Sequence, residues 1–135
     1  MLYFWGLGVL YIQSTPPFEA PDESSHFLYI HNWLETGQLP VLEDRATVLG
    51  SGSAQRHHPP LYYGLGALLI AGTDRNDLED YLLLNPAGAP GVLTLGNQNV
   101  FLHSPTSPSA QTSLAIRVLR SFSLCLAAGR SGLFS

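Results

Sequence analysis

The sequence predicts an all-α integral membrane protein, in which membrane helices flank an extracytoplasmic loop that contains juxtamembrane amphipathic helices. Charged residues make up only 12% of the 135 residues, about half the usual share, whereas hydrophobic residues reach 45%. Leu2–Ile12 is an uninterrupted apolar run, and 113–129 is apolar except for Arg117, Arg120 and scattered serines. The 13 glycines and 10 prolines cluster outside these runs, which predicts short helices joined by irregular loops.

The first apolar run predicts the end of a first transmembrane helix, at residues 1–12. A full span needs about 20 residues, so Leu2–Ile12 is either the outer half of a span or a short anchor. Tyr3, Trp5 and Tyr11 suit the membrane interface. The alternatives are a core element of a soluble domain and a signal peptide, but a signal peptide requires a basic n-region and a small-residue cleavage site that this run lacks.

Residues 13–112 are predicted to form the extracytoplasmic loop, with a first surface helix near 22–36. Asp22 follows a proline and can cap this helix, and Gly37 can end it. The helix is too polar to span a membrane and suits a position on its surface. Its two neighbouring apolar and aromatic stripes are formed by Phe27, Ile30 and Leu34, and by His26, Tyr29 and Trp33.

A second surface helix is predicted near 59–72, and the start of a second transmembrane helix at 113–129. The segment after the proline pair is apolar but shorter than a span, which favours an interfacial or re-entrant helix. Gly64 and Gly66 indicate close packing against another helix. Residues 130–135 form a tail, and the abrupt apolar ends lead us to expect a piece of a longer membrane protein.

The charged residues favour an extracytoplasmic position for 13–112 and argue against a nucleic-acid partner. The chain has no lysine, its net charge is −4, and all ten of its acidic residues lie in 13–112. Basic residues are depleted in non-cytoplasmic loops, and nucleic-acid binding requires a basic surface. The single cysteine, Cys125, allows no intrachain disulfide and is predicted to be a small buried hydrophobe.

Asp22 and Glu23 are the first candidates for catalysis. Adjacent carboxylates beside a bilayer can act as a general base, because partial desolvation makes a carboxylate a stronger base. The alternative is simple capping of the helix by acids at its N-terminus. Glu23 and His26 also have the spacing of a Glu-x-x-His metal motif, but a di-iron bundle needs two such motifs, so no metal site is predicted.

The second candidate is the histidine-proline segment, which can hold a phosphate oxygen. His57 and His58 stand rigidly before two prolines, and Arg56 adjoins them with a permanent charge. The alternative is a loop that simply enters a helix at proline. Arg117 can face the same phosphate or snorkel to the interface. The histidines without an assigned role are His31, expected in a solvated pair with Glu35, and His103, which has no evident partner.

Four motifs follow one another along the chain. They are Pro21-Asp22-Glu23 with its aromatic helix, Gly37-x-Leu39-Pro40, His58-Pro59-Pro60-Leu61-Tyr62-Tyr63 and Ala115-Ile116-Arg117-Val118-Leu119-Arg120. This ordered set resembles the N-terminal part of the GT-C superfamily of polytopic glycosyltransferases, which includes protein O-mannosyltransferase-like and aminoarabinose-transferase-like enzymes. The resemblance covers nearly the whole chain but only a minor part of such an enzyme.

The resemblance implies roles for individual residues. Asp22 matches the acidic residue that serves relatives as the catalytic base or acceptor-binding group, and Glu23 supports it. His58 stands where relatives often carry a lysine near the lipid phosphate, which is a departure from the family pattern because histidine is only partly charged near neutral pH. The expected substrate and lipid-phosphate-binding set is His58, His57, Arg56, Arg117 and Tyr62.

The implied reaction is attack by an acceptor on the anomeric carbon of a lipid-linked sugar, with polyprenyl phosphate leaving. The expected partners are a polyprenyl-phosphate-linked sugar, membrane lipid and an acceptor glycan, lipid or protein. No cofactor is expected; some relatives use a divalent metal, for which this sequence offers no ligand set. The expected location is the cell membrane, as a multi-pass protein, and the piece alone is expected to be inactive. The alternative is a non-enzymatic membrane-anchored protein whose loop binds a partner or glycan.

Overall fold

The regular secondary structure is helical in the part of the chain that the structure, a computed structural model, describes. That part comprises residues 2–39, 55, 57–88, 96–103 and 111–132. Its helices are α1 (Leu2–Ser14), α2 (Glu23–Thr36), α3 (Pro60–Ile70), α4 (Leu78–Tyr81) and α5 (Gln111–Gly132). Extended pairing in these ranges amounts to one isolated antiparallel bridge between Leu84 and Phe101. The predicted all-α class is confirmed.

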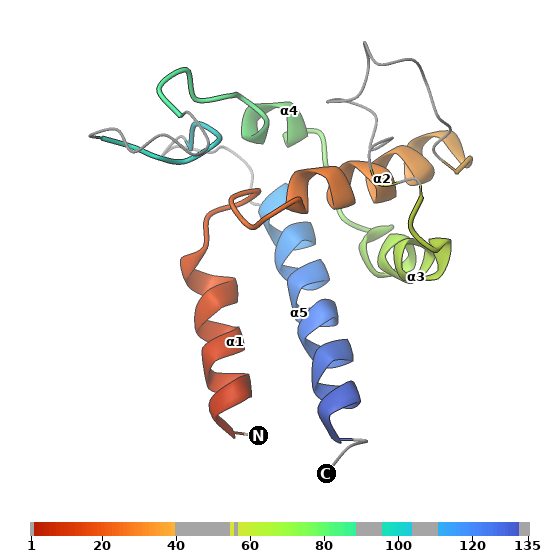
Figure 1. Cartoon of the computed structure of the whole chain (residues 1–135). Coiled ribbons are helices and arrows are strands. Elements are labelled where there is room, and N and C mark those ends of the chain that lie inside the picture. The colour runs from red at the N-terminus through yellow and green to blue at the C-terminus, as the bar shows by residue number, and fades with distance from the viewer. Residues whose placement is uncertain (1, 40–54, 56, 89–95, 104–110, 133–135) are drawn as a thin grey trace.

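The apolar helices α1 and α5 lie side by side and run in opposite directions (Figure 1). The first and last described residues therefore lie at the same end of the α1–α5 pair. At the opposite end, α2 crosses over α5, and α4 lies beyond it. Helix α3 packs against both α2 and α5. The turn between α1 and α2, helix α4 and the start of α5 therefore lie at one end of the molecule, which we call the polar end.

Helix α2 provides the centre of the core. It ends where Gly37 adopts a left-handed conformation (φ 68°) and donates its N–H to the Trp33 carbonyl at 2.9 Å. Phe27 and Ile30 are 2% and 1% exposed, as their predicted helical stripe requires. Leu34 packs against this core while partly buried. The other buried apolar residues described are Phe18, Leu28, Tyr29, Tyr63, Ala67, Ile70, Leu78, Tyr81, Phe101, Ala115, Ile116, Leu119 and Ala128.

Glycines allow α3 to approach its neighbours closely, as the sequence predicts. A Cβ atom on Gly66 would lie 2.8 Å from Ile30 Cδ1 in α2 and 3.1 Å from Leu119 Cδ2 in α5. A Cβ on Gly64 would lie 3.1 Å from the Trp33 ring. The three-helix contact of α2, α3 and α5 therefore depends on the missing side chain at Gly66.

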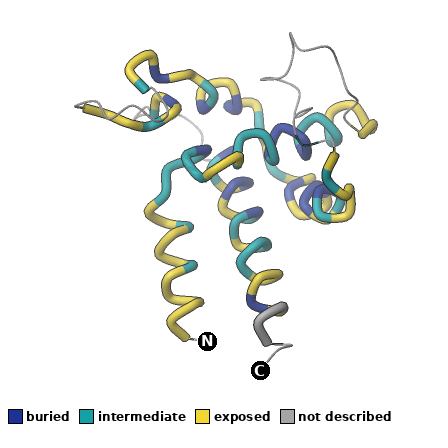
Figure 2. Tube along the Cα trace, in the orientation of Figure 1, coloured by how far each residue is buried: buried dark blue, intermediate teal, exposed yellow. Residues whose placement is uncertain are grey.

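Helix α1 exposes apolar side chains on all sides. None of its described residues is buried (Figure 2), and its sequence contains no charged residue. By length and composition, one helix in the described ranges is able to cross a membrane, at Gln111–Gly129 in α5. Helix α1 has 13 residues and is shorter than a span. The multi-pass membrane arrangement therefore stays a prediction, as does the surface position of α2 and α3.

The prediction that Cys125 is a buried hydrophobe is wrong. Its thiol is free and exposed on α5. The neighbouring Leu126 is also exposed, at 49%, whereas Leu119, nearer the start of the helix, is 8% exposed. Helix α3 lies beside the first part of α5 (Figure 1), and the exposed Cys125 and Leu126 lie in the later turns.

We expect Gly66→Val to destabilise the fold by about 1–3 kcal/mol, because a branched side chain has no room between α2 and α5. The measurement is the thermal unfolding midpoint of the purified protein in detergent. Gly6→Val is the matched control, because a Cβ on this α1 glycine meets no atom within 4 Å. Equal midpoints for the two variants would contradict the packing described for α3.

Candidate functional site

The turn that joins α1 to α2 sets the position of the two predicted catalytic acids. Phe18 and Asp22 both have a left-handed backbone, with φ of 62° and 56°. This conformation costs a residue such as phenylalanine roughly 1–2 kcal/mol. The Phe18 ring is buried against Phe27 and Phe101, with centroids 5.2 and 6.1 Å away. A strained turn of this kind persists only where surrounding contacts fix it.

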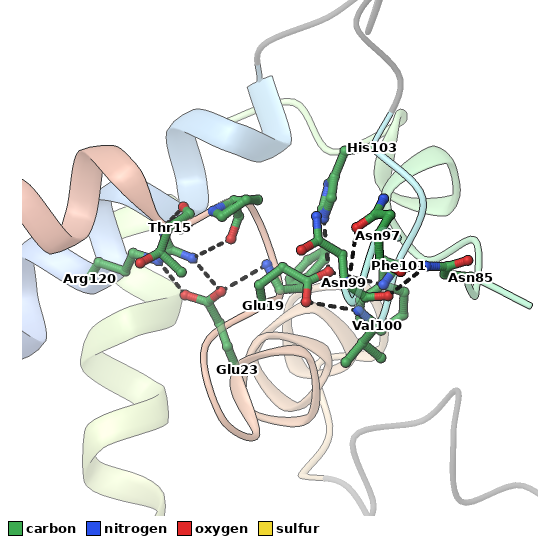
Figure 3. A network of polar contacts seen from close by, with 12 residues as sticks. Thr15, Glu19, Glu23, Asn85, Asn97, Asn99, Val100, Phe101, His103 and Arg120 are labelled. Carbon is green, nitrogen blue, oxygen red and sulfur yellow. Dashed lines mark hydrogen bonds and ion pairs between the residues drawn. The ribbon is translucent and has the colours of Figure 1, made fainter. Parts of the chain in front are cut away.

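Arg120 of α5 supplies further contacts to this turn (Figure 3). Its Nε and Nη2 donate to the two carboxylate oxygens of Glu23, at 2.5 and 2.7 Å. The guanidinium also donates to the backbone carbonyls of Ile12, Thr15 and Pro16, at 3.3, 2.6 and 2.8 Å. These bonds use all five N–H donors of an arginine side chain. One buried side chain thus ties the end of α1 and the first turn of α2 to α5.

The two adjacent acids have different surroundings. Glu23 Oε2 also accepts the Phe18 N–H at 2.8 Å, and the Glu23 side chain is 15% exposed. Asp22 is exposed, and although it occupies the N-cap position of α2 its side chain makes no capping bond. The alternative prediction, that Asp22 serves to cap α2 with its side chain, is therefore wrong. The available carboxylate of the pair is that of Asp22, and Glu23 holds the turn.

A cavity of about 550 Å³ lies between the α1–α5 pair and the helices at its polar end. Gly8 and Tyr11 of α1 line it at a distance from the turn, whereas Glu23, His26 and Arg120 line it where α2 begins. The cavity therefore has an apolar wall and a polar end. Its other apolar lining residues include Ile12, Phe27, Ile30, Ile116, Leu119 and Leu124.

Three histidines and a tyrosine meet beside the polar end of this cavity. Nδ1 of His26 lies 2.8 Å from the Tyr63 hydroxyl, and the His58 ring centroid lies 5.6 Å from that of His26. His57 packs against His58 at 4.3 Å. Burial and the nearby His58 lower the pKa of His26, and Asp22 opposes this shift. Burial raises the pKa of Tyr63 to about 12.

The structure divides the predicted phosphate-binding residues. Tyr62 lines the same cavity as His26, and its hydroxyl lies 2.8 Å from Ser123 Oγ. Arg117 is exposed and lines a separate cavity of about 240 Å³ between the end of α1 and the start of α5. Arg56 falls outside the described residues. Of the predicted set, Tyr62 lines the large cavity, whereas His58 packs beside the lining residue His26, His57 packs beside His58, and Arg117 lies at another cavity.

The prediction that His103 has no partner is wrong. Its Nε2 lies 2.9 Å from Glu19 Oε1, and the Glu19 carboxylate also accepts the N–H groups of Val100 and Phe101 at 2.9 Å each (Figure 3). Glu19 thus ties the 96–103 segment to the turn before α2. Sequence reasoning missed Glu19 because its partners lie more than eighty positions away, and no local pattern marks such a pairing.

Asn85 secures the same segment from its other side. Its Nδ2 donates to the carbonyls of Asn97 and Asn99 at 3.1 and 2.9 Å, and its Oδ1 accepts the Ala87 N–H at 3.0 Å. Asn85 is 6% exposed, so these bonds satisfy a buried amide. The asparagine side chain could be recognised in the sequence as a turn former, but its distant partners could not.

The expected solvated pair of His31 and Glu35 is replaced by another ion pair. Glu35 Oε1 accepts from Arg75 Nη2 at 3.3 Å. Arg75 Nη1 also donates to the Ile70 and Thr73 carbonyls, at 2.9 and 2.7 Å, at the end of α3. His31 Nδ1 is buried without a bonding partner among the described residues. Burial lowers the pKa of His31, and Glu35 opposes this shift.

Within the described ranges, no group of three or more histidine, cysteine, aspartate or glutamate residues is arranged to hold a metal ion. Glu23 and His26 serve different partners, since Glu23 binds Arg120 and His26 meets Tyr63. Comparison of the chain with models of known families, with characterised proteins and with solved structures finds no match.

Arg120→Gln is expected to destabilise the protein by about 3–5 kcal/mol, since it leaves a largely buried carboxylate without its cation. The Arg120 and Glu23 side chains are 8% and 15% exposed, so solvent screening is weak. Denaturant unfolding in detergent measures the loss. Arg117→Gln, one helical turn away on an exposed position, should change stability by less than about 0.5 kcal/mol. A similar loss of stability in both variants would contradict the role of Arg120 in holding the turn between α1 and α2.

Acidification should also destabilise the protein through His26 and His31. Burial lowers both folded-state pKa values below the ordinary 6.5, so the unfolded chain binds more protons once the pH falls toward 6.5. The free energy of unfolding therefore decreases from about pH 7.5 to about pH 5.5. Thermal midpoints across this range should fall less steeply in the His26→Gln/His31→Gln double variant. An unchanged slope in that variant would exclude these two groups as the cause.

Proposed function

We propose that this chain carries the N-terminal part of a GT-C type membrane glycosyltransferase, which moves a sugar from a polyprenyl-phosphate donor to an acceptor at the extracytoplasmic face. The observation that carries the proposal is the cavity of about 550 Å³, with an apolar wall on α1 and α5 and a polar end at Glu23, His26 and Arg120. A polyprenyl-phosphate sugar has the same division, because an isoprenoid chain is joined directly to a phosphate and a sugar.

The membrane position in this proposal is supported by α1 and α5. Helix α1 has no buried residue and no charge, and exposing its apolar side chains to water would be unfavourable. Helix α5 contains a 19-residue segment apolar enough to span. We place both helices in the cell membrane as part of a multi-pass protein, with the polar end at the extracytoplasmic surface. Helices α2 and α3 then lie at that surface.

In the proposed reaction, Asp22 is the catalytic base. Its carboxylate is exposed and makes no capping bond, so it is free to accept a proton from the hydroxyl or amine of an acceptor glycan, lipid or protein. The acceptor atom bonds to the anomeric carbon as the bond from that carbon to the phosphate oxygen breaks. Polyprenyl phosphate leaves with the bonding electrons. Glu23 supports this step by holding the turn that carries Asp22.

The donor phosphate is proposed to lie at the polar end of the cavity. His58, His57 and Tyr62 are the members of the predicted phosphate-binding set that line this end or adjoin it through His26. Arg117 lines another cavity and is exposed, so we assign it to the phosphate groups of membrane lipid. The proposed partners are therefore a lipid-linked sugar, membrane lipid and the acceptor.

The second candidate is a non-enzymatic membrane-anchored protein whose loop binds a partner or glycan. The observation in its favour is that Glu23, one of the two candidate acids, is fully occupied in an ion pair with Arg120. A carboxylate that holds the fold together and a carboxylate that is exposed can both occur in a protein without a catalytic role. The two functions differ in what they require of Asp22.

Asp22→Asn distinguishes them when it is introduced into the coding region of the whole protein in its native cells. We expect transfer of labelled sugar from polyprenyl phosphate by isolated membranes to fall about 100-fold or more, since general base catalysis contributes 10²–10⁴-fold. The protein level should remain unchanged. Asp80→Asn is the matched control, because Asp80 is also exposed but lies in α4. Undiminished transfer by the Asp22 variant would contradict the catalytic assignment and favour the non-enzymatic function.

A further inference from the structure

We infer that His26 binds a phosphate oxygen of the lipid-linked donor through Nε2, with Tyr63 holding the ring in the required orientation. The inference rests on the proposed function and adds a phosphate-binding residue to it. His26 lines the cavity at its polar end, next to Phe27 and Ile30 of its apolar wall. In a polyprenyl-phosphate sugar the phosphate is the first polar group after the chain, so a residue at this boundary meets the phosphate.

Tyr63 determines which nitrogen of His26 carries the proton. The Tyr63 hydroxyl retains its own proton at neutral pH, because burial raises its pKa to about 12. That hydroxyl lies 2.8 Å from His26 Nδ1, and the structure gives it no other acceptor among the described residues. Donation from the hydroxyl to Nδ1 satisfies both groups and leaves the ring proton of neutral His26 on Nε2. Nε2 is then a hydrogen-bond donor.

Nε2 of His26 is also free to reach a ligand. The buried side-chain nitrogen and oxygen atoms without partners in the described ranges belong to His31, Arg75 and Asp77. Nε2 of His26 is not among them and makes no hydrogen bond to another described residue, and His26 is one of the residues that line the cavity.

The other polar groups at this end are already occupied. Arg120 uses its five N–H donors on Glu23 and on three backbone carbonyls. Ser123 Oγ donates to the Leu119 carbonyl, so the Tyr62 hydroxyl donates to Ser123. Among the side chains that line the polar end, His26 therefore retains an available N–H donor.

The pH dependence of binding follows from this arrangement. His26 gains a positive charge as the pH falls, so its bond to an anionic phosphate strengthens. The titratable and charged groups around it are Asp22 on its own helix, His58, Tyr63 on α3, and the Glu23–Arg120 pair between α2 and α5. The donor phosphate is a diester with a single charge that does not titrate in this range. A pH dependence that disappears with His26 therefore belongs to His26.

The test measures the dissociation constant of a polyprenyl-phosphate hexose for the whole protein in lipid nanodiscs, between about pH 5 and pH 8. The wild-type constant should decrease as the pH falls. His26→Gln should weaken binding about tenfold or more at the lowest pH and flatten the profile, since hydrogen bonds to charged groups contribute about 1.5–3 kcal/mol. His31→Gln is the matched control, because His31 lies on the same helix and does not line this cavity.

Tyr63→Phe provides a second readout that a merely structural role would not give. The hydroxyl stabilises the neutral ring by donating to Nδ1, so its removal should raise the pKa of His26 and move the binding midpoint to higher pH. This variant keeps the ring and the stacking of Tyr63 on Tyr29, whose centroids lie 3.8 Å apart. A midpoint that stays in place would overturn the proposed role of Tyr63.

Further outcomes separate the inference from the proposed function. If wild-type protein binds the donor and His26→Gln binds it equally with the same pH profile, the inference is wrong and the proposed function stands. If wild-type protein does not bind the donor, both are wrong. Unlinked polyprenyl phosphate should compete, whereas inorganic phosphate and phosphatidylglycerol at the same concentration should not. Equal competition by either would overturn the assignment to a polyprenyl phosphate.

Discussion

The ion pair between Glu23 and Arg120 is the interaction on which the polar end of this protein depends. A guanidinium in an apolar helix must find acceptors for all its N–H groups, and Arg120 finds them on Glu23 and on the carbonyls that end α1. The Ile12 carbonyl lies in the last turn of α1, and the Thr15 and Pro16 carbonyls follow the helix directly. Arg120 therefore neutralises the Glu23 carboxylate in the first turn of α2 and bonds to the backbone at and after the end of α1. It joins both of these helices to α5. The buried Phe18 ring and the bonds of Glu19 to the 96–103 segment hold the same turn from its other side.

Charged side chains also bond to backbone groups at the ends of other helices. Arg75 donates to the Ile70 and Thr73 carbonyls where α3 ends, and it binds Glu35 near the end of α2. Asp77 accepts the hydroxyl and N–H of Thr112 in the first turn of α5, where a negative charge is favoured. With charged residues at only 12% of the chain, these side chains satisfy backbone groups at helix ends as well as forming pairs. A low charge content is thus compatible with charged side chains that bond to backbone groups at helix ends.

Local pattern was sufficient to predict the helical class, the apolar face with Phe27 and Ile30, and the close packing at Gly66. These depend on spacing along one helix or on the absence of a side chain. The partners of Arg120 and Glu19 depend on contacts between residues far apart in sequence, for which no local signal exists. Cys125 was misjudged because an apolar run was equated with a buried one, and an apolar helix can equally face outward.

The turn also explains how two adjacent acids come to have separate roles. Neighbouring residues at the start of a helix point in directions about 100° apart, so both cannot face the same partner. The left-handed conformation of Asp22 places its side chain outside the helix, while Glu23 begins the helix and faces Arg120. The carboxylate that is fixed cannot easily accept a further proton donor, whereas the exposed one can. If the site performs group transfer, its base is therefore the residue that the ion pair leaves free, held in place by the one that the pair retains.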